Sequence, residues 1–153
     1  MAQIQKLDVQ TAIQSSADKF YGKFKNNMTE LSKVYPEIYK NIVVLEGDGK
    51  SVGSVILWKY VCGSNSNSVT KEKIVAVDDK NRSITFEVME GDPMLNSFKS
   101  FALRIHVTGN GERSFVKWSL EFEKANEDVP HPNMYLDLLA KVTKKLDAYL
   151  LKA

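Results

Sequence analysis

The sequence predicts an α+β fold in which one curved antiparallel sheet of six or seven strands packs against a long C-terminal helix. Turn-forming residues recur along the middle of the chain and leave strands of roughly ten residues between them. Apolar and polar residues alternate along these strands, so one face of the sheet is expected to be buried. The last part of the chain carries apolar residues at helical spacing, and this stripe needs a hydrophobic partner.

The first elements are a strand and two short helices. Residues 4–13 alternate between apolar and polar side chains, which predicts a half-buried strand. A helix is expected to begin at Ser16, and a second short helical piece over residues 28–34 is stopped by Pro36. Together the two helical pieces are expected to form a corner before the next strand.

Six strands are expected to follow as an antiparallel meander. Runs of strand character at residues 38–45 and 52–62 flank a glycine-rich loop, and further turns are expected at residues 63–68, 78–81, 91–93 and 109–111. Alternation groups the side chains of the apolar face as Ile56, Trp58 and Tyr60; Ile84, Phe86 and Val88; Phe101, Leu103, Ile105 and Val107; and Val116, Trp118, Leu120 and Phe122. The opposite face is polar, so its His106 is interpreted as a surface residue.

The final helix follows Pro130 and Pro132. Its apolar stripe consists of Tyr135, Leu138, Leu139, Val142, Leu146, Tyr149 and Leu150. A helix of about 20 residues fits into the concavity of a curved sheet. Bulky side chains on both layers leave two outcomes open, an internal cavity or a filled core.

The loop E-G-D-G-K-S-V-G-S at residues 46–54 imitates two nucleotide-binding signatures without satisfying either. A Walker loop needs a glycine where Val44 stands, and the spacing of Gly47, Gly49 and Gly53 does not fit the dinucleotide fingerprint. A strand follows the loop rather than a helix. We therefore interpret it as a hairpin connection whose glycines allow positive φ, with direct phosphate contact as the alternative.

Composition indicates one globular domain over residues 1–153, expected to be a monomer. The net charge is only +2, with no basic stripe, so nucleic acid is not an expected partner. No apolar run reaches the ~20 residues that span a bilayer, so no membrane insertion is expected. Cys62 is the only cysteine, and the N-terminus lacks the apolar core of a signal peptide, which favours a cytoplasmic location.

Several segments in order resemble the plant major latex proteins of the Bet v I (birch pollen allergen, pathogenesis-related) superfamily. They are L-E-G-D-G-K-S-V-G-S-V-I-L-W-K-Y at residues 45–60, V-M-E-G-D-P-M at 88–94, F-K-S-F at 98–101, V-K-W-S-L-E-F-E-K at 116–124 and the helix over 135–151. The resemblance covers essentially the whole chain.

This resemblance implies a helix-grip (START-like) fold: a seven-stranded curved antiparallel sheet, two short helices and a long C-terminal helix enclosing an apolar cavity. It also implies small hydrophobic plant ligands of sterol, fatty acid, flavonoid, hormone or alkaloid type, with entrance between the glycine loop, the turn at residues 91–96 and the start of the last helix. No cofactor or metal is expected. The implied ligand-binding wall comprises Phe24, Ile56, Trp58, Tyr60, Ile84, Phe86, Val88, Phe101, Leu103, Trp118, Leu120, Leu138, Leu139 and Val142.

Two functions follow, a carrier or store of hydrophobic metabolites, as in defence or stress responses, and an alkaloid-type cyclase or isomerase with a pocket carboxylate. Along residues 69–78 alternation leaves open which face is buried, and the resemblance turns Thr70, Glu72, Ile74 and Ala76 inward. Glu72 is then either a pocket acid or base, or a rim carboxylate paired with a lysine. The pocket lysine of the superfamily's catalytic members is absent here, because the next strand turns Ile84, Phe86 and Val88 inward.

Overall fold

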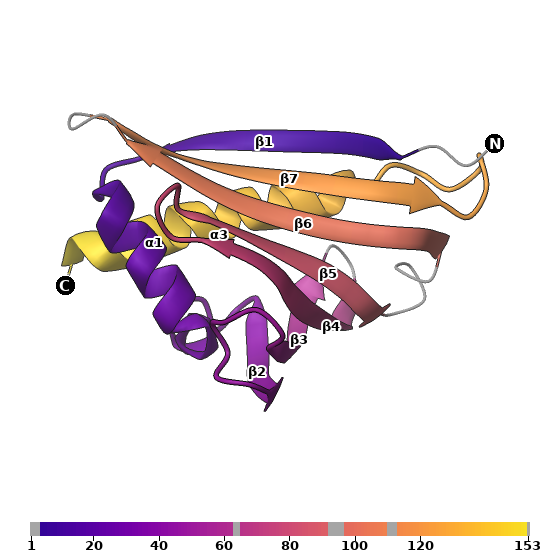
Figure 1. The fold of residues 1–153 in the computed structure, drawn as a ribbon, viewed down its shortest axis with the longest axis horizontal. Helices are drawn as coiled ribbons and strands as arrows, with labels where there is room; N and C mark the ends of the chain where they lie inside the picture. Colours follow the sequence, from indigo (N-terminus) through magenta and orange to yellow (C-terminus); the bar gives the residue numbers. More distant parts are fainter. Residues whose placement is uncertain (1–3, 63–64, 92–96, 110–112, 153) are drawn as a thin grey trace.

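The computed structural model describes residues 4–62, 65–91, 97–109 and 113–152. Their elements, in chain order, are β1 (Gln5–Ile13), α1 (Ala17–Asn26), η1 (Met28–Glu30), α2 (Leu31–Val34), β2 (Tyr39–Glu46), β3 (Val55–Cys62), β4 (Asn65–Asp78), β5 (Ser83–Gly91), β6 (Phe98–Gly109), β7 (Ser114–Lys124) and α3 (Asn133–Lys152) (Figure 1). The predicted order of strand, two short helices, six strands and long helix is confirmed.

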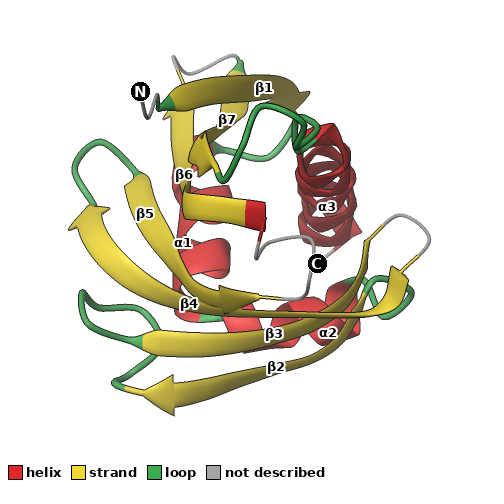
Figure 2. Ribbon diagram, turned by 90° about the vertical axis from the view of Figure 1, so that its right-hand side faces the viewer, coloured by secondary structure: helices red, strands yellow, loops and turns green. Residues whose placement is uncertain are grey.

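The seven strands form one antiparallel sheet in the order β1-β7-β6-β5-β4-β3-β2. Strands β2 to β7 therefore make the predicted meander, and β1 joins its far edge beside β7. Figure 2 shows that the sheet curves strongly and that α3 lies across its open side. Helix α3 contacts β1 and β7 near one edge and β3 near the other, so it bridges the two ends of the curve.

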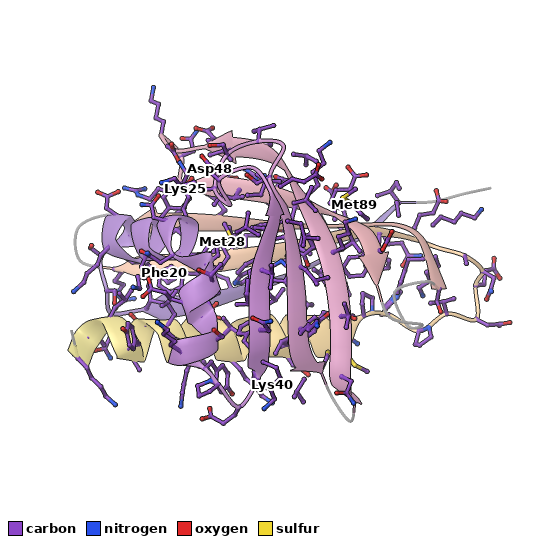
Figure 3. All side chains as sticks on the ribbon, turned by 90° about the horizontal axis from the view of Figure 1, so that it is seen from below. Phe20, Lys25, Met28, Lys40, Asp48 and Met89 are labelled. Carbon is purple, nitrogen blue, oxygen red and sulfur yellow. The ribbon has the colours of Figure 1, made fainter. Side chains whose placement is uncertain are left out.

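The helical corner begins where the sequence predicts it. The hydroxyl of Ser16 accepts a hydrogen bond from the backbone N–H of Lys19 at 3.1 Å, which caps α1. Phe20 on α1 and Met28 on η1 are both buried (Figure 3). This corner therefore packs its apolar side inward and closes one end of the space between sheet and helix.

The inward face of the sheet forms much of the core, as alternation predicts. Ile84, Ile105, Val107, Val116, Leu120 and Phe122 have no measurable exposure. On the opposite face Glu87 and Arg104 are exposed and His106 is half-buried. Burial, together with the charges of Arg104 and Lys117, lowers the pKa of His106, so its imidazole is neutral near pH 7.

Strand β4 differs from the sequence prediction in two respects. It begins at Asn65, inside the segment expected to be a turn. An irregularity in its pairing with β5 lies between Ile74 and Ala76, so that Ile74 is buried whereas Ala76 is exposed and Val77 packs against the core. The expectation that Ala76 points inward is therefore wrong, because a β-bulge inserts one residue and shifts the alternation by one.

Two further boundaries are corrected. Val52, expected at the start of a strand, lies in the turn before β3 and is 61% exposed. The predicted turns at residues 91–93 and 109–111 fall largely outside the described residues, where only the strand ends Gly91 and Gly109 are seen.

The buried stripe of α3 differs at one position from the predicted one. Tyr149 is 43% exposed, so its assignment to the stripe is wrong. The side chains of Thr143 and Asp147 are buried instead, because a stripe of 3.6-residue period passes through them between Leu139 and Leu150. Among the helices described, none is long and apolar enough to cross a membrane.

Candidate functional site

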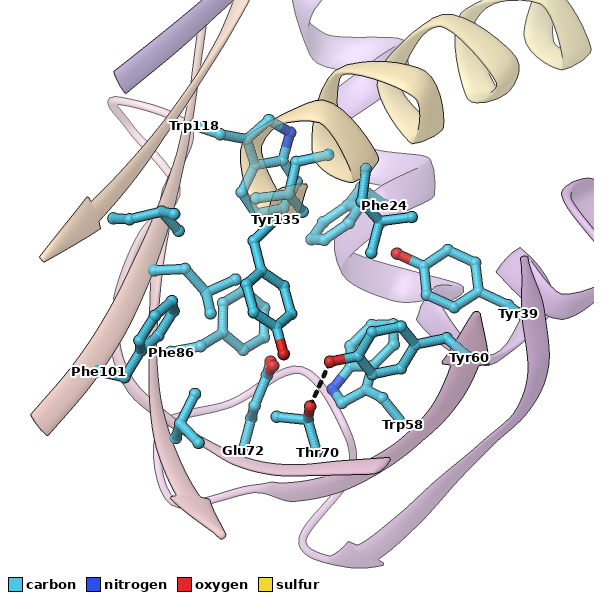
Figure 4. A pocket seen from close by; sticks show the side chains of 15 residues that line it. Phe24, Tyr39, Trp58, Tyr60, Thr70, Glu72, Phe86, Phe101, Trp118 and Tyr135 are labelled. Atoms are coloured by element: carbon cyan, nitrogen blue, oxygen red, sulfur yellow. Dashed lines mark hydrogen bonds between the residues drawn. The ribbon is translucent and has the colours of Figure 1, made fainter. Parts of the chain in front are cut away.

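The space between the sheet, α1 and α3 contains a buried pocket (Figure 4). Its wall comes from both layers of the fold and is mainly aromatic and aliphatic. It is lined by Phe24, Tyr39, Trp58, Tyr60, Thr70, Glu72, Phe86, Val88, Phe101, Leu103, Trp118, Leu120, Tyr135, Leu138 and Leu139. The strand residues among them lie on the inward face, while Phe24 reaches in from α1 and the last three from α3.

Most of the wall residues expected from the sequence lie around this pocket. They are Phe24, Trp58, Tyr60, Phe86, Val88, Phe101, Leu103, Trp118, Leu120, Leu138 and Leu139. Ile56, Ile84 and Val142 do not line it and are instead buried in the surrounding core. Alternation predicts the face on which a side chain lies, but the height along the strand at which the layers separate depends on packing in three dimensions.

Three lining residues were not in the predicted wall: Tyr39, Thr70 and Tyr135. Tyr135 belongs to the same helical stripe as Leu138 and Leu139, so its place could have been found from spacing alone. Thr70 shares its parity with Glu72, which was identified as a candidate. Tyr39 follows the α2 turn, and the sequence carries no comparable signal for it.

The aromatic side chains of the pocket contact one another. Ring centroids lie 5.5 Å apart for Phe24 and Trp118 and 5.7 Å apart for Tyr39 and Trp58. The open space between them is about 50 Å³, enough for a few water molecules if each needs about 10–15 Å³. The pocket is thus nearly closed, and a larger ligand would enter only if these side chains separated.

One side of the pocket carries its polar atoms. The hydroxyls of Tyr60 and Thr70 share a hydrogen bond of 2.6 Å. Trp58 is 6% exposed, and its Nε1–H has no acceptor among the described protein groups. Trp118 differs, because its Nε1–H donates to the hydroxyl of Thr143 at 2.9 Å.

Glu72 is the acidic side chain of this polar side. It is 8% exposed, and none of the ion pairs within the described part of the chain includes it. The structure therefore contradicts a rim carboxylate paired with a lysine. Burial raises the pKa of Glu72 to about 8, so the carboxyl group is mainly protonated at neutral pH.

The neighbouring phenols remain neutral. Burial, and secondarily the charge of Glu72, raises the pKa of Tyr39 well above its usual value. Burial also raises the pKa of Tyr60. Because these tyrosines stay protonated, the pocket offers hydroxyl groups and one titratable carboxyl, with no lysine among the lining residues described.

The glycine-rich loop connects β2 to β3, which confirms the hairpin interpretation. Gly47, Gly49 and Gly53 all have positive φ, between 79° and 96°. The carboxylate of Asp48 accepts hydrogen bonds from the backbone N–H groups of Lys50 at 2.9 Å and Ser51 at 2.8 Å. These bonds lower the pKa of Asp48, so the loop's own anion occupies amides that a phosphate would need.

Of the expected entrance, the glycine loop and the start of α3 are described, whereas residues 92–96 lie outside the described residues. Cys62 is buried at the end of β3, in keeping with its interpretation as a packing residue. The candidate site is therefore the pocket itself.

A curved antiparallel sheet that holds a long C-terminal helix over a buried aromatic pocket defines a helix-grip protein with an internal site. Residues 2–153 match the Pathogenesis-related protein Bet v 1 family, and the chain belongs to this family. Its relatives include MLP-like protein 43 of Arabidopsis thaliana, which is 40% identical over 148 residues, covering 95% of this chain and 92% of that protein.

Solved structures show the same fold. The crystal structure of ginseng major latex-like protein 151 from Panax ginseng superposes with a TM-score of 0.91 at 36% identity, covering 97% of this chain and 98% of that chain. Norcoclaurine synthase from Thalictrum flavum, in complex with dopamine and hydroxybenzaldehyde, has a TM-score of 0.81 at 20% identity, covering 99% and 88%. At that identity the synthase shares the fold alone with this chain.

Proposed function

We propose that this protein binds small hydrophobic plant metabolites in the pocket between the sheet and α3 and carries or stores them. The classes we expect are sterols, fatty acids, flavonoids, hormones and alkaloids, in a defence or stress response. The observation that carries this proposal is the pocket wall of aromatic and aliphatic side chains contributed by both the sheet and α3. Membership of the Bet v 1 family supports it.

The energetics favour broad affinity over strict selectivity. Apolar burial contributes about 25 cal/mol per Å² of ligand surface, before the cost of association, and it depends little on ligand shape. A ligand must also separate aromatic pairs such as Phe24 and Trp118, which now contact each other. Ligand contacts would replace those lost between the rings, so the closed pocket sets a threshold on ligand size rather than a fixed shape.

The remaining parts of the proposal concern the setting of the protein. We propose a monomer in the cytoplasm that does not act on nucleic acid. A net charge of +2 supports the last point, since affinity for nucleic acid depends on clustered cations. The hydrogen bonds of Asp48 to the glycine loop also speak against phosphate binding there.

Substitution of Leu139 by tryptophan tests the pocket. The larger side chain should fill the space above the sheet and weaken binding of 8-anilinonaphthalene-1-sulfonate, followed by its fluorescence, at least tenfold. Leu151→Trp is the matched control, because Leu151 lies on the same helix but is 51% exposed. Unchanged probe affinity in a folded Leu139→Trp protein would contradict the proposed site.

The same question can be asked of the natural ligand. A carrier that holds its cargo in a closed pocket should keep it through gentle purification from plant tissue. Native mass spectrometry should then show a discrete added mass, which Leu139→Trp removes. Protein that is always empty would weaken the carrier proposal in favour of a transient substrate.

A second function is favoured by one observation, the buried carboxyl of Glu72 with its pKa raised to about 8. Such a group exchanges protons near neutral pH and could serve a cyclase or isomerase as general acid or base. Incubation with dopamine and hydroxybenzaldehyde is a direct assay. Glu72→Gln should abolish any turnover while retaining probe binding, and turnover that persists would exclude Glu72 as the acid or base.

A further inference from the structure

The two tryptophans of the pocket wall differ in the state of their indole nitrogens. Trp118 Nε1–H is bound to Thr143, whose hydroxyl in turn donates to the backbone carbonyl of Leu139 at 2.8 Å. Trp58 Nε1–H is equally buried, but no described protein group accepts from it. A buried donor without an acceptor is unfavourable, so its persistence in a pocket wall points to a ligand atom as its partner.

The register of β3 and β4 places Trp58 among the polar atoms of the pocket. Trp58 lies directly opposite Thr70, and Ile56, two residues earlier on the same face, lies opposite Glu72. Trp58 and Glu72 are therefore diagonal neighbours on the inward face. Figure 4 shows the indole nitrogen of Trp58, the Tyr60–Thr70 hydroxyl pair and the Glu72 carboxyl on one side of the pocket, with the Tyr135 hydroxyl directed toward Glu72.

We infer that this polar side is a head-group subsite that recognises an uncharged carbonyl oxygen of the ligand, through hydrogen bonds donated by Trp58 Nε1–H and the Glu72 carboxyl group. The inference rests on the proposed function, because it specifies the ligand class of the same pocket. The apolar body of such a ligand, a ketone or a similar carbonyl compound, would lie among Phe24, Phe86 and the leucines of α3.

The chemistry of the subsite selects against charged groups. An ammonium group has no lone pair and would leave the N–H of Trp58 without an acceptor. A carboxylate would lose its hydration without gaining a cation, because the lining residues described include no lysine or arginine. A neutral carbonyl accepts two hydrogen bonds and carries a smaller desolvation penalty, so it fits both donors.

The protonation of Glu72 agrees with this role. The groups that surround it are Tyr39 of β2, Trp58 and Tyr60 of β3, Thr70 of its own strand and Tyr135 of α3, while β5 and β6 contribute only apolar side chains to the wall. No charged side chain among them stabilises a carboxylate, and burial raises the pKa of Glu72 to about 8. Below that pH the group is an O–H donor beside a second donor, as a carbonyl acceptor requires.

A pair of probes of equal shape tests the inference. In 2-acetylnaphthalene a carbonyl oxygen replaces the terminal methylene of 2-isopropenylnaphthalene. The ketone should bind about five- to tenfold more tightly at pH 6.5, the effect of one or two net hydrogen bonds. In ¹⁵N–¹H spectra the ketone should move the indole N–H signal of Trp58 downfield, while the signal of Trp118, whose N–H is already bound, should stay within its range with the hydrocarbon.

The variant Trp58→Phe assigns the signal and tests the preference. It should lower ketone affinity to that of the hydrocarbon and leave hydrocarbon affinity within about twofold, since the apolar wall is kept. Trp118→Phe is the matched control, because it removes an indole that does not face the ligand oxygen. It should change the affinity for both probes by the same factor and so preserve the preference.

The outcomes separate the subsite from the pocket. Equal affinity for both probes, with no downfield shift of the Trp58 indole, would overturn the carbonyl subsite and leave the proposed carrier function standing. Failure of both probes to bind would overturn the carrier function and the subsite together. A preference for the ketone that survives Trp58→Phe would also overturn the assignment of this donor.

Discussion

The carboxylate of Asp147 accepts a hydrogen bond of 2.9 Å from the backbone N–H of Ser15, 132 positions earlier in the chain. Its second oxygen accepts from the N–H of Gln14, also at 2.9 Å. One side chain on α3 thus holds the turn between β1 and α1. This pair of bonds ties the helix that covers the pocket to the corner that closes one end of it.

Asp147→Ala should lower the free energy of unfolding by about 1–3 kcal/mol, because it leaves two largely buried N–H groups without an acceptor. Asp137→Ala is the matched control, since Asp137 is exposed on the same helix. It should change stability by less than about 0.5 kcal/mol. Denaturant unfolding followed by circular dichroism measures both, and equal effects of the two variants would contradict a structural role for Asp147.

The buried carboxyl of Glu72 predicts a specific pH dependence of stability. Its pKa is raised from the ordinary 4.5 to about 8 in the folded protein, so between these values the folded state holds a proton that the unfolded state has lost. Stability contributed by this group therefore falls as pH rises from about 4.5 to about 8. Above pH 8 the folded protein must bury a carboxylate, and the full penalty, on the order of a few kcal/mol, is present.

Glu72→Gln removes this titration while retaining a similar shape. Its free energy of unfolding relative to the wild type should increase steadily across the same pH range and then level off. Urea unfolding at intervals between pH 4 and pH 9 measures the difference, in which contributions from Asp78, Asp79 and other groups common to both proteins cancel. A difference independent of pH would show that Glu72 does not have a raised pKa.

Two glycines should respond oppositely to alanine. Gly47 has φ of +79°, and a Cβ there would lie 2.6 Å from the hydroxyl oxygen of Ser54, so Gly47→Ala should destabilise the protein by about 1–2 kcal/mol. Gly22 lies within α1 and has open space around an added Cβ. Gly22→Ala should stabilise it by up to about 1 kcal/mol through helix propensity. Thermal melts of the two variants test this, and a change of the same sign in both would contradict it.

The element order could be predicted from the sequence because each signal is local. The Ser16 cap, the stop at Pro36 and the alternation through Phe86 or Leu120 depend on residues only a few positions apart. The bulge beside Ala76 could not be predicted in the same way. It depends on how β4 pairs with β5, and pairing between strands is not encoded by the period of one strand.

The candidate site was predictable to a similar degree. Inward parity placed Trp58, Tyr60 and Leu120 on the correct face, and resemblance to a known family indicated that the face borders a pocket. It did not distinguish Ile56 and Ile84, which are buried in the core, from neighbours that line the pocket. That distinction depends on where α3 lies along the sheet.

The sequence by itself determined the order of the elements, the buried face of the sheet and most of the apolar wall, because periodicity and turn chemistry act over short distances. Only the tertiary structure decided that Glu72 is buried without a cation, that Trp58 and Trp118 differ in hydrogen bonding, and that the pocket is nearly closed. These properties arise where β3, β4 and α3 meet, and local sequence periodicity does not determine contacts between elements so far apart in the chain.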